Sequence, residues 1–218
     1  MGECYYNGRG VAKDIKQAIY WLKEAAEQGH LGAQFNLGVS YMNEQNCQEC
    51  RTLAEFWLKK AAEGGVVDAQ VNLFTYYYLI GNYSNAVFWI QKAAEKGDVA
   101  AQYSLGVCYY NGQGVTKDLN KAIFWYKKAA EQGYVDALLG IALCYYDEPE
   151  STRDYKQIVY WLNKAALQGN AEAQYNLGFC YYNGQGVQKN LKQAIYWYEK
   201  AANQGSLEAQ KALKQLQQ

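Results

Sequence analysis

The six tryptophans of this chain stand in one recurring sequence context, and their spacing limits the fold more than any other feature. Each is followed three residues later by a charged residue and then by Ala-Ala, as in Trp21-Leu22-Lys23-Glu24-Ala25-Ala26. Successive tryptophans lie 36, 32, 36, 36 and 36 residues apart. A pattern that recurs at this interval is typical of solenoids, in which one small unit is stacked many times. The six are Trp21, Trp57, Trp89, Trp125, Trp161 and Trp197.

Each unit is predicted to contain two helices, as residues 98–133 illustrate. Asp98 and Asp118 are suited to cap the two helices, because a carboxylate accepts hydrogen bonds from free N–H groups of the first turn. The apolar residues of the first helix recur at i, i+4, i+7 and i+8, which places them on one helix face. Asn111-Gly112-Gln113-Gly114 separates the helices, and Gly133 is suited to end the second one.

Small residues such as Gly106 indicate close contact between helices. A short helix pair cannot bury both of its faces alone, so neighbouring units must share a continuous core. We therefore predict an all-α fold, a solenoid of about six helix-turn-helix repeats that are mostly 36 residues long, in a single domain over residues 1–218. The first helix is predicted to be truncated at the N-terminus, because Gly2-Glu3-Cys4-Tyr5 aligns with the middle of a later first helix. Residues 207–218 are predicted to form a polar capping helix.

Two units depart from the pattern. Residues 44–51 replace the usual Gly-x-Gly-Val loop by a segment that contains Cys47 and Cys50. The unit around Ile80–Ser84 lacks four loop residues, which explains the spacing of 32. We expect a shortened connection between the two helices there.

The charge balance argues against two classes of partner. The chain has 21 basic and 21 acidic residues, and no stretch is basic enough for nucleic acid or an anionic membrane surface. The most apolar window, Val71–Ile80, is too short to cross a bilayer. No signal peptide is visible, so the compartment stays open, with the cytoplasm slightly favoured. We expect a monomer.

The repeat resembles a known family. The strings AQYNLGFCYYNGQGV at residues 173–187 and AIYWYEKAA at residues 194–202 are similar to the SEL-one-like repeat (SLR), a relative of the tetratricopeptide repeat. The resemblance covers essentially the whole chain. It implies a right-handed superhelix whose first helices line a concave face, and an adaptor role in bacterial signalling, host contact, envelope assembly, effector immunity or protein quality control, without selecting among them.

Candidate chemistry is sparse. His30, the single histidine, follows a helix stop and is expected to face water, since triads and most zinc sites need a histidine with partners. Cys4, Cys108, Cys144 and Cys180 share one repeat position on the core face, too far apart for disulfides, and are expected to be buried free thiols. Cys47 and Cys50 form a lone CxxC, for which a loop disulfide or two idle thiols are the alternatives. We expect no cofactor and no metal site.

Other motifs have structural explanations. A cysteine-rich branch of the resembled family carries one disulfide per repeat, and the second cysteine is absent here, so the β-lactam binding of that branch loses its support. The Gly-x-Gly loops join two helices, whereas a phosphate-binding glycine run must follow a strand. The acidic residues are scattered over helix surfaces without an isolated pair for general acid–base work.

The inner face implied by the resemblance supplies the candidate binding residues. An Asn amide can pair with the backbone of an extended peptide, and tyrosine is enriched at binding hot spots. Packing between helices is the alternative role, because Asn and Tyr also belong to the general repeat pattern. A C-terminal carboxylate ligand is not favoured, because the lysine clamp of some relatives is absent. The candidates are Phe35, Asn36, Asn72, Tyr103, Ser104, Tyr110, Tyr146, Tyr175, Asn176 and Tyr182.

The sequence thus favours a non-enzymatic scaffold or adaptor that binds a partner protein or peptide on its concave face. The alternatives are a hydrolase of β-lactam or cell-wall type, for which no nucleophile with a nearby base is seen, an immunity or inhibitor protein for a secreted effector, and an architectural array that self-associates through its repeat ends.

Overall fold

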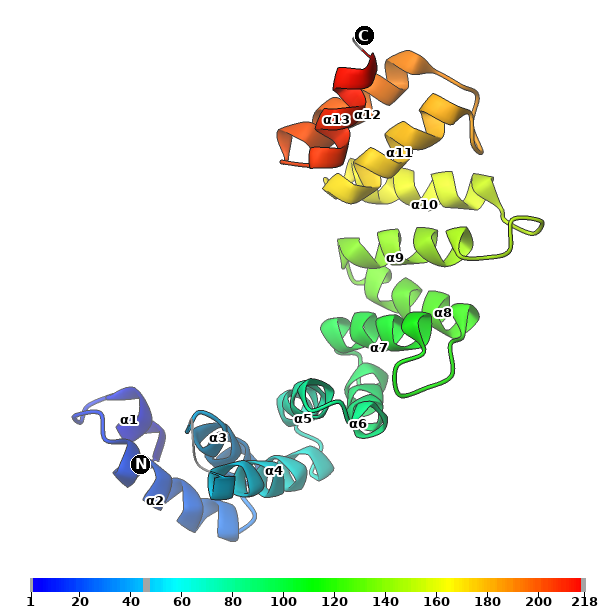
Figure 1. Ribbon diagram of the computed structural model, residues 1–218. Helices are drawn as coiled ribbons and strands as arrows, with labels where there is room; N and C mark the ends of the chain where they lie inside the picture. Colours follow the sequence, from blue (N-terminus) through cyan, green and yellow to red (C-terminus); the bar gives the residue numbers. More distant parts are fainter. Residues whose placement is uncertain (1, 45–47, 217–218) are drawn as a thin grey trace. The chain divides into compact units, whose positions relative to one another are not determined.

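The computed structural model describes residues 2–44 and 48–216, and every regular element within them is an α-helix. The thirteen helices of these residues are six successive pairs, α1–α2 to α11–α12, followed by α13, which confirms the all-α repeat fold (Figure 1). They are α1 (Gly2–Asn7), α2 (Ile15–Glu27), α3 (Leu31–Met42), α4 (Gln48–Glu63), α5 (Val67–Leu79), α6 (Tyr83–Glu95), α7 (Val99–Asn111), α8 (Leu119–Glu131), α9 (Val135–Tyr146), α10 (Tyr155–Leu167), α11 (Ala171–Asn183), α12 (Leu191–Asn203) and α13 (Leu207–Leu216).

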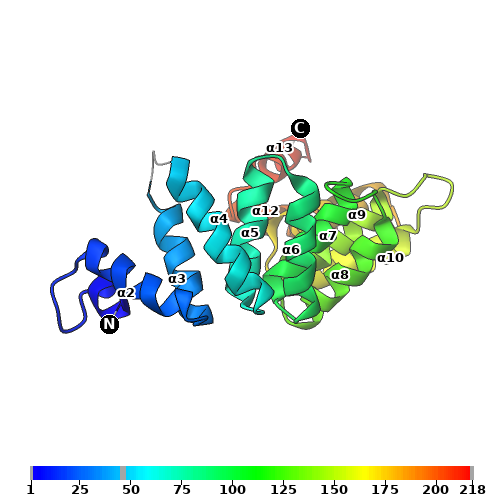
Figure 2. The same cartoon turned by 90° about the horizontal axis from the view of Figure 1, so that it is seen from below.

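The helices belong to two compact units, Met1–Ala101 and Gln102–Gln218, with the boundary inside α7. Within each unit, each helix packs on the next one along the chain from α1 to α6 and from α8 to α13. Helices α3 and α4, for example, lie side by side in both views (Figures 1 and 2). The single domain expected from the sequence stays a prediction, and the units are described separately below.

The core of the N-terminal unit is built from second-helix alanines and leucines that meet the next first helix. Leu58 and Ala61 of α4 pack with Leu73 of α5 and Trp89 of α6. All four side chains are buried. Trp57 and Trp89 are therefore core residues in this part of the chain, whereas Trp21 is 38% exposed.

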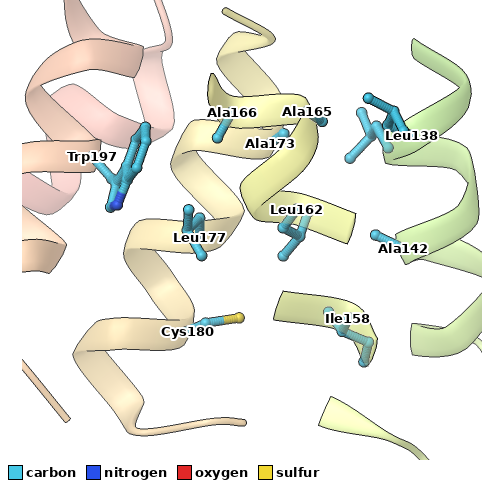
Figure 3. Close-up of a cluster of buried hydrophobic side chains, with 11 residues drawn as sticks. Leu138, Ala142, Ile158, Leu162, Ala165, Ala166, Ala173, Leu177, Cys180 and Trp197 are labelled. Carbon is cyan, nitrogen blue, oxygen red and sulfur yellow. The ribbon is translucent and has the colours of Figure 1, made fainter. Parts of the chain in front are cut away.

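The core of the C-terminal unit follows the same plan through four helices. Leu138 of α9, Leu162 of α10, Leu177 of α11 and Trp197 of α12 belong to one buried cluster (Figure 3). Cys180 lies in this cluster and carries a free thiol, as expected. The second helix α10 is thus held between the first helices α9 and α11 by apolar contacts.

Polar caps and glycines set the helix ends as the sequence predicts. Asp118 accepts a hydrogen bond from the backbone N–H of Lys121, and Asp98 accepts one from that of Ala101 at 2.7 Å. Gly133 has a φ of +89°, in the left-handed region that favours glycine. The helix-turn-helix unit is therefore encoded locally, residue by residue.

Gly106 marks a close approach between helices, which confirms its predicted role. A Cβ atom at this position would lie 2.6 Å from the ring of Tyr126 on α8. The same ring would lie 2.9 Å from a Cβ at Gly140 on α9. Tyr126 therefore fills space that two glycines leave open on either side of it.

The structure also explains the two repeats that depart from the sequence pattern. Only three residues separate α5 from α6, against seven between α7 and α8, so the spacing of 32 does come from a shortened connection. Cys50 lies inside α4 and not in a loop, which corrects that part of the prediction, because the helix begins at Gln48. Cys50 is disulfide-bonded, and Cys47 lies outside the described residues.

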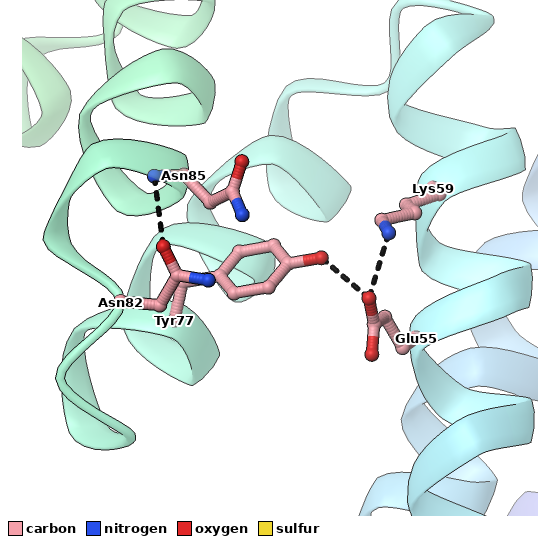
Figure 4. A network of polar contacts seen from close by, with 5 residues as sticks. All are labelled: Glu55, Lys59, Tyr77, Asn82 and Asn85. Carbon is pink, nitrogen blue, oxygen red and sulfur yellow. Dashed lines mark hydrogen bonds and ion pairs between the residues drawn. The ribbon is translucent and has the colours of Figure 1, made fainter.

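A polar network links α4 to α5 in the N-terminal unit (Figure 4). The Tyr77 hydroxyl and the Lys59 ammonium both donate to Glu55 Oε1, at 2.5 and 2.7 Å. Burial opposes ionisation of Glu55, but the hydrogen bonds from Lys59 and Tyr77 outweigh it and hold the pKa of this carboxyl below its ordinary value. Each of the remaining five repeats has Ile or Val at the position equivalent to Glu55.

No helix in the described ranges combines the length and the hydrophobicity that a membrane span requires.

Candidate functional site

A hollow of about 280 Å³ opens between α9, α10 and α11 of the C-terminal unit. Its walls are mostly apolar side chains of the two first helices, α9 and α11, and of the second helix between them. We call it the α9–α11 pocket. It is lined by Ala142, Leu143, Tyr146, Tyr155, Ile158, Leu162, Tyr175, Asn176, Phe179, Cys180 and Gln185.

Helical spacing explains how these side chains converge. Ile158 and Leu162 stand four residues apart on α10 and are each 3% exposed, so they form the floor. Asn176 and Phe179 stand three residues apart on α11, and Phe179 is 40% exposed at the rim. The pocket therefore has a buried apolar floor, and Asn176 and Gln185 add side-chain amides to its wall.

One edge of the pocket is fixed by Arg153, which precedes α10. Its guanidinium lies 4.5 Å from the ring centroid of Tyr146 and 5.8 Å from that of Tyr155. It also donates to the carbonyl oxygen of Glu148 at 3.1 Å and to the Tyr155 hydroxyl at 3.3 Å. Arg153 thus holds two pocket tyrosines together and positions the rim.

A second hollow of about 140 Å³ adjoins the first one on α11. Tyr175 and Phe179 line both, and Tyr182 lines the second together with residues of α12 and α13. The two hollows therefore follow the first helices α9, α11 and α13 in order, on either side of Tyr175 and Phe179.

The structure brings together four of the candidate residues named from the sequence. Tyr146, Tyr175 and Asn176 line the α9–α11 pocket, and Tyr182 lines the adjoining hollow. Tyr146 and Tyr182 are 46% and 39% exposed, so their rings are accessible. A role in binding stays a prediction for all four.

The candidates in the N-terminal unit do not form such a hollow. Phe35 packs against the buried cluster around Leu58. The Asn72 amide donates to the carbonyl oxygen of Asp68 one turn earlier in its own helix, at 2.8 Å. Asn36 lines a broad depression between α1, α2 and α3.

The candidates on α7 are engaged in packing. Tyr103 stacks on Tyr134, with ring centroids 4.7 Å apart, and is tilted against Tyr126. Burial raises the pKa of Tyr103 and of Tyr110, and Lys117 lies over the Tyr110 ring. Ser104 is half-buried and lies outside the two hollows. For Tyr103, these contacts fit the alternative role given in the sequence analysis, which is packing between helices.

Sequence reasoning missed Leu143, Tyr155 and Phe179, which form much of the pocket wall. A signal was present at one repeat position, two residues after the buried leucine or isoleucine of each first helix. This position holds Val39, Thr75 and Val107 in the second to fourth repeats, Leu143 in the fifth and Phe179 in the sixth. From the second repeat onward, the side chain at this position thus becomes larger only in the last two repeats. Comparison of side-chain size at equivalent positions could have found this feature.

Two buried thiols of this unit, Cys180 in the pocket wall and Cys144 on α9, have raised pKa values. Burial raises the pKa of the Cys180 thiol to about 11, and burial followed by the charge of Asp147 raises that of Cys144 to about 12. Both thiols are therefore protonated at neutral pH and act as small apolar groups. In the described part of the chain, no three His, Cys, Asp or Glu side chains gather as metal ligands would.

Comparison with known proteins places the chain in context. The Sel1 repeat model matches residues 1–30, 32–66, 67–98, 99–134, 135–170 and 171–206. The chain is similar to a solved Sel1 repeat protein from Oxalobacter formigenes, with 36% identity, a TM-score of 0.61, and coverage of 92% of this chain and 82% of the other. Curated protein sequences give no match.

Another similar structure is that of c5321, a protective antigen of uropathogenic Escherichia coli with an SLR fold. The two are 36% identical with a TM-score of 0.78 over 96% of this chain, which spans only 46% of the antigen. The immunity protein PA5088 from Pseudomonas aeruginosa is 18% identical over 95% of this chain and 82% of its own, with a TM-score of 0.49, and this likeness carries no functional argument.

Proposed function

The chain belongs to the Sel1 repeat family, and we propose that it is a non-enzymatic scaffold whose C-terminal unit binds a partner protein through the α9–α11 pocket. Sel1 repeats are generally protein-interaction scaffolds. The observation that carries the proposal is an apolar hollow bordered by exposed aromatic side chains and the side-chain amides of Asn176 and Gln185.

The size of the pocket favours a side chain over a free small molecule. At about 280 Å³ it lies just below the usual range of about 300–1,000 Å³ for small-molecule sites. A single aromatic or large aliphatic side chain fits such a space. Anchors of this kind, set into a desolvated pocket, contribute most of the energy of many protein interfaces.

The polar groups suit a peptide backbone beside that anchor. The Asn176 amide has both a donor and an acceptor, as a peptide group requires. Tyr146, Phe179 and Tyr182 offer rigid contact area at low entropic cost. The adjoining hollow at Tyr182 would extend the contact along the partner segment.

The test is selection of binding peptides from a random phage-displayed library against the whole chain. We expect the selected peptides to share one aromatic or large aliphatic residue. In calorimetry, Asn176→Ala combined with Phe179→Ala should weaken their binding at least about tenfold, or 1.4 kcal/mol.

The matched control is Asn72→Ala, which removes an amide bonded within its own helix and should leave the affinity unchanged. Circular dichroism checks that each variant is folded. Selected peptides that bind the pocket variant as tightly as the unaltered chain would refute the proposed site, as would failure to select any peptide.

A further inference from the structure

A second surface feature recurs in each of the six repeats and is not part of the pocket. An aromatic residue stands immediately before each tryptophan, and its ring meets the tryptophan edge to face. These side chains are 46–56% exposed. Exposed apolar groups that gather on a surface commonly mark an interaction site. The six side chains are Tyr20, Phe56, Phe88, Phe124, Tyr160 and Tyr196.

A lysine accompanies the ring in the last five units. It stands four residues after the aromatic residue, one helical turn on, and its ammonium lies 4.6–5.3 Å from the ring centroid. The lysines are Lys60, Lys92, Lys128, Lys164 and Lys200. Each of these five repeats thus presents an aromatic ring and a positive charge together, whereas the first repeat has Glu24 in place of the lysine.

This surface faces away from the pocket, as α10 shows. Tyr155, Ile158 and Leu162 line the pocket, whereas Tyr160 and Lys164 are exposed. At about 100° per residue, the mean directions of these two sets of side chains around the helix axis are about 175° apart. A ligand on one side would leave the other side free.

Charge distinguishes the two units at this surface. The second helices of the C-terminal unit, α8, α10 and α12, carry seven lysines and two glutamates, a net charge of +5. Those of the N-terminal unit, α2, α4 and α6, carry six basic and six acidic residues, a net charge of zero. The chain as a whole is neutral, so the positive charge is concentrated on one set of helices.

The positive surface also continues from helix to helix. Lys127 of α8 lies over the Trp161 ring of α10, 5.8 Å from its centroid, and Lys164 lies over the same ring at 5.0 Å. Within the described residues, Lys128, Lys164 and Lys200 make no ion pair with an acidic side chain. Their charge is therefore available to a partner.

We propose that this aromatic–lysine face, formed by Phe124, Lys128, Tyr160, Lys164, Tyr196 and Lys200, binds an acidic protein segment that carries interspersed apolar side chains. Carboxylates would pair with the ammonium groups, and apolar side chains would cover the exposed rings. The proposal is independent of the pocket and concerns a second partner surface.

The ring geometry favours a protein segment over the other anionic partners. Single-stranded nucleic acid stacks its bases on free aromatic faces, and here a lysine already lies over one face of each ring. A helix that lies on a lipid surface needs a broad apolar face. Each of these helices exposes one aromatic ring with a lysine one turn on, and only a single further leucine is exposed on α10 (Leu167) and on α12 (Leu191). An acidic segment needs only charge and contact area.

The experiment is fluorescence anisotropy with the full chain and a labelled peptide of repeated Glu-Glu-Phe-Gly units. We expect binding that weakens with added salt, because the contacts are between exposed charges. Lys164→Glu combined with Lys200→Glu should weaken it at least about tenfold. A peptide with Gln in place of Glu should bind more weakly than the acidic one.

The control is Lys60→Glu combined with Lys92→Glu, which alters the same repeat positions in the N-terminal unit and should change the affinity less than about twofold. Equal loss in both double variants, or no binding of the acidic peptide, would overturn the proposal. Tighter binding of poly(uridylic acid) or of phosphatidylglycerol vesicles than of the peptide would overturn it as well. The pocket variant at Asn176 and Phe179 should bind the acidic peptide normally.

Discussion

The side-chain amide of Gln174 donates to the carbonyl oxygen of Ala166 at 3.0 Å, from a position where the glutamine is only 4% exposed. Gln34 and Gln70 make the same bond to Ala26 and Ala62. A carbonyl in the last turn of a helix lacks its intrahelical partner. The same carbonyl of Ala166 also accepts from the backbone N–H of Gly169 at 3.1 Å. The glutamine of one first helix thus adds a side-chain hydrogen bond at the end of the preceding second helix.

Gln174→Ala should destabilise the chain by about 2–3 kcal/mol, because it removes this bond and leaves a cavity in a buried site. Gln174→Leu should cost less, about 1 kcal/mol, since Leu138 fills the equivalent position one unit earlier. The midpoints of urea unfolding measure both effects. Equal stability of the Ala variant and the unaltered chain would show that the bond is not needed.

Gly106→Ala should destabilise by about 1–3 kcal/mol, because the added Cβ would lie 2.6 Å from the Tyr126 ring. Gly32→Ala is the matched control, since a Cβ there meets nothing within 4 Å. The control should raise stability by about 0.5–1 kcal/mol, as alanine favours the helix. Thermal unfolding of the two variants should therefore shift in opposite directions.

Acid should weaken the link between α4 and α5. The pKa of Glu55 lies below its ordinary value in the folded chain, so its contribution is present above the ordinary value and is lost as the pH falls through the lowered one. Glu55→Ile introduces the residue found in other units and removes this titration.

The difference in urea midpoint between the unaltered chain and Glu55→Ile should therefore shift in favour of the variant as the pH falls below about 4.5. Other carboxyl groups titrate in both proteins and cancel in the difference. A difference that stays constant from neutral to acidic pH would contradict the network.

Thiol labelling should follow burial. Cys144 is fully buried and Cys180 is 5% exposed, and their pKa values are raised to about 12 and 11. The thiolate is the reactive form, so iodoacetamide at pH 8 should modify the half-buried Cys4 well before either of them. Mass spectrometry locates the labels, and urea should abolish the difference. Rapid native labelling of Cys144 would contradict the packing.

The helical framework could be predicted from the sequence because its determinants are local. Asp118 caps a helix and Gly133 ends one through contacts within a few residues. The tryptophan spacing reports the length of the unit directly, including the shortened connection near Gly81.

The candidate site could be predicted only in part, because it depends on side-chain directions and on neighbours from other units. Asn72 and Asn176 occupy equivalent positions, yet the first bonds its own helix and the second lines the pocket. The pocket also needs Phe179 and the placement of Tyr155 by Arg153, which no single repeat reveals. Glu55 breaks an apolar pattern, but its partner Tyr77 lies 22 residues away.

The two opposed faces of α10 have a consequence for dosage. A scaffold that holds one partner on Tyr155, Ile158 and Leu162 and another over Tyr160 and Lys164 would bridge them without competition for space. Such a bridge works best when its concentration matches that of its partners. In excess, the two partners would be captured by separate copies, so overproduction of the chain would disperse the ternary complex that a moderate amount assembles.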